Sequence, residues 1–339
     1  MILTTVSFRA LVPQDDPKTE NIISSVSTIV RKVLVQPEMD REPSVSDTDH
    51  EQEPSIQTAF SITHVFTPEE LRRKGYATRT MSLLHGQISQ SSTATPSAVQ
   101  SAHSGDKQTA DEDSYPTGIL SFLYSGVGDF YSRCGIPGWH IQKSTETYWD
   151  VEAVLSIPSS DTSLVDVRYL TEDDFQAIAK RDAELLAKEI SFRAREGKPR
   201  AFAILPTGEE FTWLVARSKF YGQILSPHPL PEYWGVEVDE DNFAIWFIDF
   251  VKHELQFLRL RCSDGQKLTI MVKAAAAIAK EHQCPNIQAW NLDITLLEDT
   301  KNYGVEVITR DRAGNLAAVA WYANGECPEW IANEKYGWC

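Results

Sequence analysis

Short apolar runs alternate with glycine-containing turns and amphipathic segments along the first third of the chain. Apolar residues at every second position are typical of strands, and apolar residues three or four positions apart are typical of helices. The pattern predicts strands at residues 3–11, 21–36, 59–66 and 118–124, with the first two forming a hairpin. Helices are predicted at residues 78–88 and 127–134, and Met81, Leu83 and Leu84 are expected on the buried side of the first. This order predicts an α/β fold, with a mixed central sheet flanked by helices.

A longer helix is predicted to begin after Thr171, where Asp174 at the third helical position completes a capping box, and to end near Gly197. The segments that follow repeat the order of the first half. They are predicted strands at 201–205, 233–238, 243–251, 254–261 and 287–292, helices at 209–223 and 267–282, a short helix ending near 303–304, and a closing hairpin at 305–322. We therefore predict a second, degenerate lobe of the same fold, with a first domain at residues 1–160 and the second lobe at residues 165–339.

Two segments differ from the rest in composition. Residues 38–57 are acidic and rich in Ser, Pro and Asp, and residues 87–117 consist mainly of Ser, Thr, Ala, Gln and Gly. Neither contains enough apolar side chain to offset the entropic cost of ordering it. We predict two disordered insertions within the first domain.

The formal net charge of the 339-residue chain is −16, from 48 acidic and 32 basic residues. Nucleic acids and anionic membranes are themselves negative, so this balance argues against both as partners and favours a cationic small molecule. No apolar run approaches the roughly 20 residues of a membrane-spanning helix, and the N-terminus does not resemble a secretory signal. We expect a cytoplasmic protein.

Five cysteines without a CxxC pair indicate reduced thiols, neither a disulfide framework nor a metal site.

The most informative segment is a strand that runs into a glycine-containing turn and then a helix, at residues 65–78. Such a turn leaves backbone N–H groups unpaired at the start of the helix, and Gly75 allows an anion to approach the main chain. Arg72, Arg73 and Lys74 add local positive charge to an otherwise acidic chain. The pattern predicts a pyrophosphate-binding loop; the alternative is a surface turn with an ordinary basic triplet.

The sequence Arg72-x-x-Gly75-x-Ala77 resembles the [Q/R]-x-x-G-x-[G/A] loop of the GNAT acetyltransferases. A second match, Phe130-Tyr131-Ser132-Arg133-Cys134-Gly135, is similar to the F-Y-x-x-x-G helix that follows the next strand in that superfamily. Residues 123–131, together with the long second lobe, resemble the fungal lysine N-acetyltransferase group. The resemblance covers most of the chain, but its motifs are concentrated between residues 65 and 135.

This resemblance implies acetyl-CoA as co-substrate and a small, cationic amine as acceptor. The cofactor-binding residues are then expected to be Val65, Phe66, Arg72, Arg73, Lys74, Gly75, Tyr76, Ala77 and Thr78. Backbone N–H groups at Val65 and Phe66 would hold the thioester carbonyl, and Tyr131 would protonate the departing thiolate. The alternative role of Tyr131 is packing on the sheet.

A lysine ammonium has a pKa of about 10.4 and must lose a proton before it attacks a thioester. His64, on the strand just before the loop, is the candidate base, although strand histidines are more often only packed.

The corresponding loop of the second lobe, residues 260–268, lacks the R-x-x-G-x-A spacing and carries Asp264 where a phosphate would bind. We therefore expect this lobe to recognise the acceptor. Glu237, Asp239 and Asp249 are carboxylates that could pair with a cation, and one or two of its tryptophans could line a cationic pocket.

GNAT enzymes usually begin with a strand and two helices that form one wall of the acceptor pocket, and this chain begins at what resembles the second strand. Either the second lobe supplies that wall, the chain is truncated, or activity has been lost. Three hypotheses follow: acetylation of free lysine or a similar small amine, acetylation of an amine in a fungal specialised-metabolite pathway, and an inactive GNAT-fold scaffold.

Overall fold

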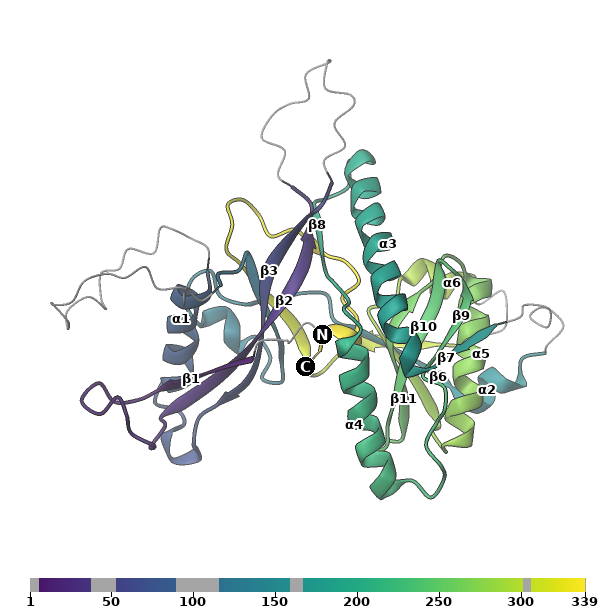
Figure 1. The fold of residues 1–339 in the computed structure, drawn as a ribbon, viewed down its shortest axis with the longest axis horizontal. Coiled ribbons are helices and arrows are strands. Elements are labelled where there is room, and N and C mark those ends of the chain that lie inside the picture. Colours follow the sequence, from purple (N-terminus) through teal and green to yellow (C-terminus); the bar gives the residue numbers. More distant parts are fainter. Residues whose placement is uncertain (1–5, 38–52, 90–115, 159–166, 301–305, 339) are drawn as a thin grey trace, which may run out of the picture. The chain divides into compact units, whose positions relative to one another are not determined.

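The computed structural model describes residues 6–37, 53–89, 116–158, 167–300 and 306–338. The chain divides into two units, each with its own mixed sheet and its own helices (Figure 1). Unit 1 comprises residues 1–35, 55–142 and 313–329, and unit 2 comprises residues 36–54, 143–312 and 330–339. The predicted mixed α/β class is confirmed.

Unit 1 is built around strand β3 (Ser55–Phe66), which pairs antiparallel with β2 (Ser24–Val35) and parallel with β4 (Leu120–Ser125). The sheet continues from β4 to β14 (Leu316–Trp321) and β5 (His140–Ile141), and β1 (Val6–Leu11) pairs with β2 as the predicted hairpin. Helix α1 (Tyr76–Ile88) connects the parallel strands β3 and β4.

The core of unit 1 lies between α1 and the sheet and contains Phe60, Met81, Leu84 and Trp139. Met81 and Leu84 are buried as predicted, but Leu83 is 39% exposed. The prediction for Leu83 is wrong because a helical turn of 3.6 residues places Leu83 to one side of the stripe formed by Met81, Leu84 and Ile88. The helix predicted at 127–134 is only the 3₁₀ turn η2 (Phe130–Arg133).

Unit 2 has a seven-stranded sheet in the order β13-β6-β12-β11-β10-β9-β7. Its strands are β6 (Thr145–Asp150), β7 (Arg168–Leu170), β9 (Gly235–Asp239), β10 (Asn242–Asp249), β11 (Glu254–Arg261), β12 (Asn286–Trp290) and β13 (Ile308–Asp311). Strands β11 and β12 are parallel and are connected by α5 (Gly265–Glu281), whereas the other described strand pairs of this sheet are antiparallel. The β11-α5-β12 segment thus repeats the strand-helix-strand arrangement of β3-α1-β4.

Helices cover both faces of this sheet. Figure 1 shows α3 (Phe175–Arg195) and α4 (Glu209–Leu225) on one side, and α5 and α6 (Ile294–Thr300) on the other. The capping box predicted at Thr171 and Asp174 is present, in a 3₁₀ turn (Glu172–Asp174) that leads into α3. Helix α2 (Val151–Ser156) packs beside α5, and the short strand β8 (Ala201–Ile204) lies between α3 and α4 in sequence.

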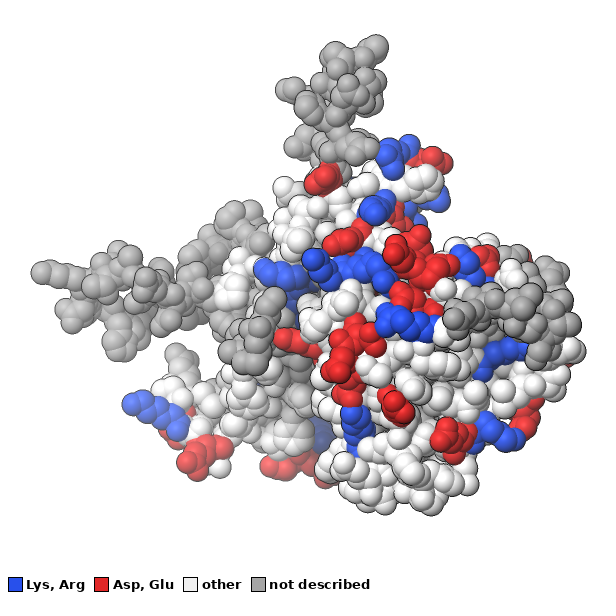
Figure 2. All heavy atoms as spheres, turned by 45° about the vertical axis from the view of Figure 1, so that its right-hand side comes forward, with Lys and Arg blue, Asp and Glu red and all other residues white. Residues whose placement is uncertain are grey.

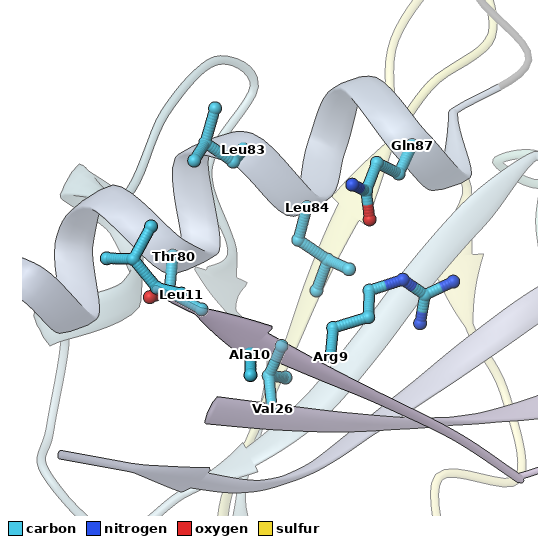
Figure 3. A pocket seen from close by; sticks show the side chains of 8 residues that line it. All are labelled: Arg9, Ala10, Leu11, Val26, Thr80, Leu83, Leu84 and Gln87. Carbon is cyan, nitrogen blue, oxygen red and sulfur yellow. The ribbon is translucent and has the colours of Figure 1, made fainter. Parts of the chain in front are cut away.

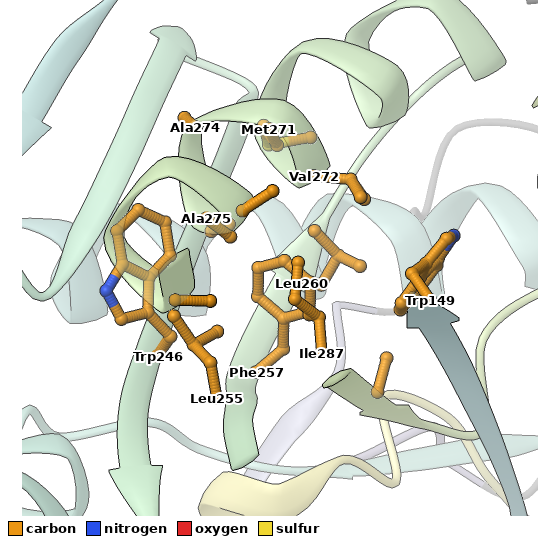
Figure 4. Close-up of a cluster of buried hydrophobic side chains, with 14 of the residues drawn as sticks. Trp149, Trp246, Leu255, Phe257, Leu260, Met271, Val272, Ala274, Ala275 and Ile287 are labelled. Carbon is orange, nitrogen blue, oxygen red and sulfur yellow. The ribbon is translucent and has the colours of Figure 1, made fainter. Parts of the chain in front are cut away.

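The core between α5 and the sheet is rich in aromatic and small residues. Trp149 on β6, Trp246 on β10 and Phe257 on β11 belong to the same core cluster as the alanines of α5 (Figure 4). The rings of Trp149 and Phe257 meet edge to face, with centroids 6.0 Å apart. Large residues on the strands and small residues on the helix allow α5 to approach the sheet closely.

The predicted closing hairpin at residues 305–322 does not form. Strand β13 pairs with β6 in unit 2, whereas β14 pairs with β4 and β5 in unit 1. The turn between them has local hairpin character, but β14 is apolar on both faces and is almost completely buried between two strands of unit 1. Burial of both faces outweighs local pairing at this position.

The structural division also differs in position from the predicted boundary near residues 160–165. The chain passes from unit 1 to unit 2 between Gln142 and Lys143, and residues 313–329 return to unit 1. The sequence prediction missed β6, a strand of mixed polar and apolar residues. Most of the predicted insertions at 38–57 and 87–117 lie outside the described residues, while 55–57 belong to β3 and 87–88 to α1.

Candidate functional site

The candidate site begins where β3 and β4 diverge. The two parallel strands pair from Ala59 and Leu120 to Ile62 and Leu123, and β3 then continues to Phe66 paired with β2 but not with β4. The register of β3 against β2 shifts in the same region, and His64 has a positive φ of 51°, which together define a β-bulge. Among the described strand pairs, none joins residues 63–66 to β4. The bulge therefore lies where the pairing of β3 with β4 ends.

Val65 and Phe66 lie at this divergence, as the predicted oxyanion function requires. Val65 packs against the core of unit 1, and Phe66 is 54% exposed. On the opposite edge of the strand, the carbonyl of Phe66 accepts a hydrogen bond from the Ser24 hydroxyl at 3.0 Å. The end of β3 is thus anchored to β2.

The loop that follows β3 is exposed and basic. The Nε of Arg72 donates to the carbonyl of Thr67 at 3.1 Å, which fixes the base of the side chain and leaves the outer guanidinium nitrogens directed elsewhere. Arg73 and Gly75 both have positive φ, and a Cβ added at Gly75 would meet no atom within 4 Å. Open space above Gly75 is what close approach of an anion to the backbone requires.

Helix α1 starts directly after Gly75 and has an uncapped N-terminus. Gly75 provides no side-chain cap, and the first turn contains no acidic residue. The N–H groups of Tyr76, Ala77 and Thr78, which are half-buried, therefore lack intrahelical acceptors. These N–H groups, the positive end of the helix dipole and the three preceding cations all favour a phosphate at this position.

Tyr131 lies in η2, next to the first turn of α1. Burial, reinforced by the nearby Cys134 thiol, raises the pKa of its hydroxyl. Cys134 is buried and interacts with the Thr78 hydroxyl, so it connects η2 to the start of α1. The raised pKa keeps Tyr131 protonated at neutral pH, which is the state that a proton donor requires.

Gly135, the final residue of the second motif, allows η2 to approach α1. Its φ is 90°, and a Cβ at this position would lie 2.8 Å from a ring carbon of His85 and 3.2 Å from the Cα of Ser82. A glycine is required here both for backbone conformation and for space. The glycine of the second motif is therefore needed for the packing of η2 against α1.

His64 is exposed on the bulge, and its Nδ1 lies 3.3 Å from the hydroxyl of Thr63. No described carboxylate is hydrogen bonded to its ring. The structure thus places His64, Val65 and Phe66 at the end of β3, beyond its pairing with β4. Tyr131 lies beside α1, the helix that follows the basic loop. These assignments remain predictions.

A buried hydrogen-bond chain that the sequence prediction missed lies beneath α1. Trp139 Nε1 donates to the Ser121 hydroxyl at 2.9 Å, the hydroxyls of Ser121 and Tyr322 are 2.5 Å apart, and Tyr322 lies 3.0 Å from His85 Nδ1. His85 Nε2 lies 3.0 Å from the carbonyl of Cys134. The carbonyl can only accept and the indole can only donate, so the neutral Nε2–H tautomer gives every link a donor and an acceptor.

Burial lowers the pKa of His85 to about 4, in agreement with a neutral ring, and burial raises that of Tyr322. His85 also stacks on Trp139 with centroids 3.9 Å apart. No local sequence signal could have revealed this chain, because Tyr322 follows His85 by 237 positions.

A small hollow in unit 1 lies between α1 and strands β1 and β2, as Figure 3 shows. Its lining is mainly apolar, and Arg9, Thr80 and Gln87 supply the polar groups. None of the predicted site residues lines it. The hollow lies along the side of α1, whereas the predicted anion site is at the N-terminus of that helix.

The corresponding helix of unit 2 has a capped N-terminus. The Asp264 side chain accepts a hydrogen bond from the N–H of Lys267 at 2.9 Å, and Lys267 pairs with Asp239 at 3.0 Å. Glu237 is held by Arg168 and Arg181. The carboxylate of Asp264 therefore occupies the position in unit 2 at which a phosphate is predicted to bind in unit 1. Of the three carboxylates predicted to recognise the acceptor, Glu237 and Asp239 already have cationic partners.

Charges are intermixed on the face seen in Figure 2, where basic and acidic side chains lie next to one another. Among the described helices, none is long and apolar enough to cross a membrane. Within the same residues, no cluster of three or more His, Cys, Asp or Glu side chains is arranged to hold a metal ion.

Comparison with known proteins gives three findings. Residues 153–339 match the family model described as the LYC1 GNAT-like C-terminal domain. The chain is 26% identical over 247 residues to a lysine acetyltransferase of Yarrowia lipolytica, and the match covers 67% of this chain and 59% of the relative. The chain thus spans less than two thirds of that relative's length.

Two similar solved structures are a GCN5-related N-acetyltransferase from Kribbella flavida and Eis1 from Mycobacterium abscessus. The first is 10% identical with a TM-score of 0.48, and the similarity covers 93% of this chain and 60% of that one. The second is 13% identical with a TM-score of 0.46, and the coverage is 93% of this chain and 64% of that one.

Proposed function

We propose, since the chain belongs to the GNAT family described as the LYC1 GNAT-like C-terminal domain, that it transfers the acetyl group of acetyl-CoA to the amine of free lysine or a similar small amine. The similarity to a lysine acetyltransferase supports this acceptor class. The observation that carries the proposal is the uncapped N-terminus of α1, preceded by Arg72, Arg73 and Lys74 and by the open space above Gly75.

In this proposal the pyrophosphate of acetyl-CoA binds at the start of α1. The N–H groups of Tyr76, Ala77 and Thr78 donate to the phosphate oxygens, and the three basic side chains neutralise their charge. The thioester then extends toward the end of β3, beyond its pairing with β4, where we expect main-chain N–H groups near Val65 and Phe66 to bind the thioester oxygen. Charge that develops on the thioester oxygen is stabilised there.

The transfer needs one base and one acid. The acceptor ammonium loses a proton to His64, directly or through water, and the neutral amine attacks the thioester carbon. The C–S bond then breaks, the attacking nitrogen releases its second proton to solvent, and the thiolate accepts a hydrogen bond from Tyr131. A thiol pKa of about 8.5 is far below that of a buried tyrosine, so Tyr131 serves by shielding and hydrogen bonding the thiolate as it forms, with complete proton transfer following from solvent.

Calorimetric titration of the full chain with acetyl-CoA, followed by addition of L-lysine while free thiol is measured, tests the proposal. The expected result is micromolar binding and thiol release that depends on lysine. A folded chain that does not bind acetyl-CoA would refute the cofactor site. Binding without thiol release for any small amine would favour a non-catalytic scaffold.

Tyr131→Phe separates the role of the hydroxyl from that of the ring. We expect a lower kcat with an unchanged affinity for acetyl-CoA, because the ring still packs against the core. An unchanged kcat would remove Tyr131 from the mechanism.

A further inference from the structure

The parallel strands of unit 2 also diverge, but there the space is occupied by the chain itself. Strands β11 and β12 pair only at their beginnings, from Glu254 and Asn286 to Gln256 and Gln288. Beyond this point, the carboxylate of Glu334 accepts a hydrogen bond from the N–H of Leu260 at 2.7 Å. Residues 333–336 are therefore anchored beside the end of β11.

The same segment is anchored at the end of β12. The Asn291 side chain donates to the carbonyl of Asn333 at 2.5 Å. These two anchors hold the intervening backbone in place and position the next side chain, Lys335, against Trp290 at the end of β12.

Lys335 is a buried cation enclosed by aromatic rings. It is 6% exposed, and its Nζ lies 4.1 Å from the ring centroid of Trp290 and 4.2 Å from that of Trp338. Among the described residues, no carboxylate forms an ion pair with it. Indole faces compensate only part of the cost of burying an ammonium group, so a site of this kind favours an added anion.

Other cations increase this preference. The guanidinium of Arg312 lies 3.7 Å from the centroid of the same Trp290 ring. Arg312, Lys252 on the turn after β10 and Arg217 on α4 all act on Lys335 with positive charge, and Asp249 opposes them. Three cations against one carboxylate form a positive region within a chain of net charge −16.

We infer that Lys335, between Trp290 and Trp338, is the main cationic contact of a site in unit 2 that binds a free amino acid through its carboxylate. The choice of ligand rests on the proposed function, since free lysine carries such a carboxylate. A single ammonium group pairs with either a carboxylate or a phosphate, so the proposed amino-acid substrate decides the choice of carboxylate. Phosphate is therefore tested as the competing anion.

The charge state of Lys335 gives the site a pH dependence. Burial and the neighbouring cations lower the pKa of Lys335 to about 7. A bound carboxylate raises this pKa, so binding takes up a proton when the pH is above 7. Affinity for the carboxylate is expected to be highest below pH 7 and to fall as the pH rises from 7 toward the pKa of the complex.

Binding of L-lysine and cadaverine to the full chain, measured by calorimetry, tests the inference. Cadaverine is the same diamine without the carboxylate. We expect lysine to bind the wild type at least about tenfold more tightly than cadaverine, and Lys335→Met to abolish this difference without changing cadaverine binding. Lys280→Met, on the exposed surface of α5, is the matched control and should behave as the wild type.

Two results would overturn the inference: equal affinities of the wild type for lysine and cadaverine, or an unchanged preference in folded Lys335→Met. If inorganic phosphate binds in a Lys335-dependent manner and lysine does not bind, the site is a phosphate site and the carboxylate assignment is refuted. If Lys335→Met does not fold, the pH dependence of lysine binding to the wild type still tests the inference. The lysine preference must then decline above pH 7 with measurable proton uptake, and a preference independent of pH would refute the role of Lys335.

Acetyl-CoA titration and thiol release in the same samples distinguish this inference from the proposed function. Lysine binding that depends on Lys335, without acetyl transfer, would retain the carboxylate site and refute the acetyltransferase. Acetylation of lysine by a wild type that binds lysine and cadaverine equally would retain the acetyltransferase and refute the carboxylate site.

Discussion

Units 1 and 2 share a strand-helix-strand segment, but they differ at the N-terminus of its helix. In unit 1, α1 begins at Gly75 without a side-chain cap and follows three basic residues. In unit 2, α5 begins at Asp264, whose carboxylate accepts from the N–H of Lys267. The two arrangements give opposite electrostatics at the same place in the topology, because one leaves helix N–H groups for an external anion and the other satisfies them internally.

The strand divergence beside each helix differs in the same way. After Ile62 and Leu123, no described strand pairs with the end of β3 on its β4 side. After Gln256 and Gln288, Glu334 and the backbone of Asn333 bind the ends of β11 and β12. A shared arrangement of strands therefore does not by itself predict a cofactor site; the proposal for unit 1 rests on the uncapped N-terminus of α1 and its basic loop.

The largest expected effect is that of Gly75→Glu on acetyl-CoA binding. A glutamate would place bulk and negative charge where the pyrophosphate is proposed to bind, and we expect a loss of at least about 100-fold in affinity, or about 2.7 kcal/mol. Gly197→Glu is the matched control, because Gly197 also has positive φ and open space around its Cα. Calorimetry on both folded variants measures the effect, and wild-type affinity in Gly75→Glu would refute the phosphate-binding loop.

The next effect concerns acid stability and should be larger in unit 1 than in unit 2, where burial also lowers the pKa of His282 but by less. The pKa of His85 is about 4 in the folded protein, below its ordinary value of 6.5, so the unfolded chain binds more protons between these values. This contribution to stability is complete above pH 6.5 and declines as the pH falls toward 4. We expect unit 1 to lose about 2 kcal/mol between pH 7 and pH 5.

Hydrogen exchange at several pH values measures this loss in each unit separately. His85→Gln should reduce the pH dependence of unit 1, whatever its effect on stability at pH 7. Equal acid sensitivity of α1 and α5 would contradict the role of the His85 chain.

A smaller effect is expected for Arg72→Gln. Removing one charged donor from the loop should weaken acetyl-CoA binding by about tenfold, or about 1.4 kcal/mol. The remaining affinity should also depend less on salt concentration, because fewer charges meet the phosphates. Arg261→Gln, at the end of β11 in unit 2, should leave acetyl-CoA binding unchanged; if it weakens binding equally, the effect of Arg72 is not local.

The smallest effect is that of Asp264→Ala in unit 2. Loss of the cap on α5 should reduce the free energy of unfolding by about 1 kcal/mol, as measured by chemical denaturation. Acetyl-CoA affinity should not change, because the proposed site lies in unit 1. A second equivalent of bound acetyl-CoA in this variant would show that the cap alone prevents binding in unit 2.

Local sequence patterns predicted most of the helices and strands correctly. The hairpin of β1 and β2 and the capping box before α3 depend on residues a few positions apart, and α1 begins at Tyr76, two residues before its predicted start. The basic loop was likewise predictable from neighbouring residues, because Arg72 and Gly75 are only three positions apart. The motif glycine Gly135 was visible in the sequence, but its reason, contact with His85 and Ser82, was not.

The tertiary structure alone decided which sheet each late strand joins and which buried groups meet. Strand β14 enters unit 1 between β4 and β5 because both of its faces are apolar, a preference that local turn chemistry could not reveal. The His85–Tyr322 contact and the position of Lys335 against Trp290 likewise join residues far apart in the chain. The sequence by itself determined the local geometry of the helix start at which we propose an anion to bind, because a helix start is encoded by neighbouring residues. Burial, pKa shifts and long-range pairing arise only when distant segments pack together.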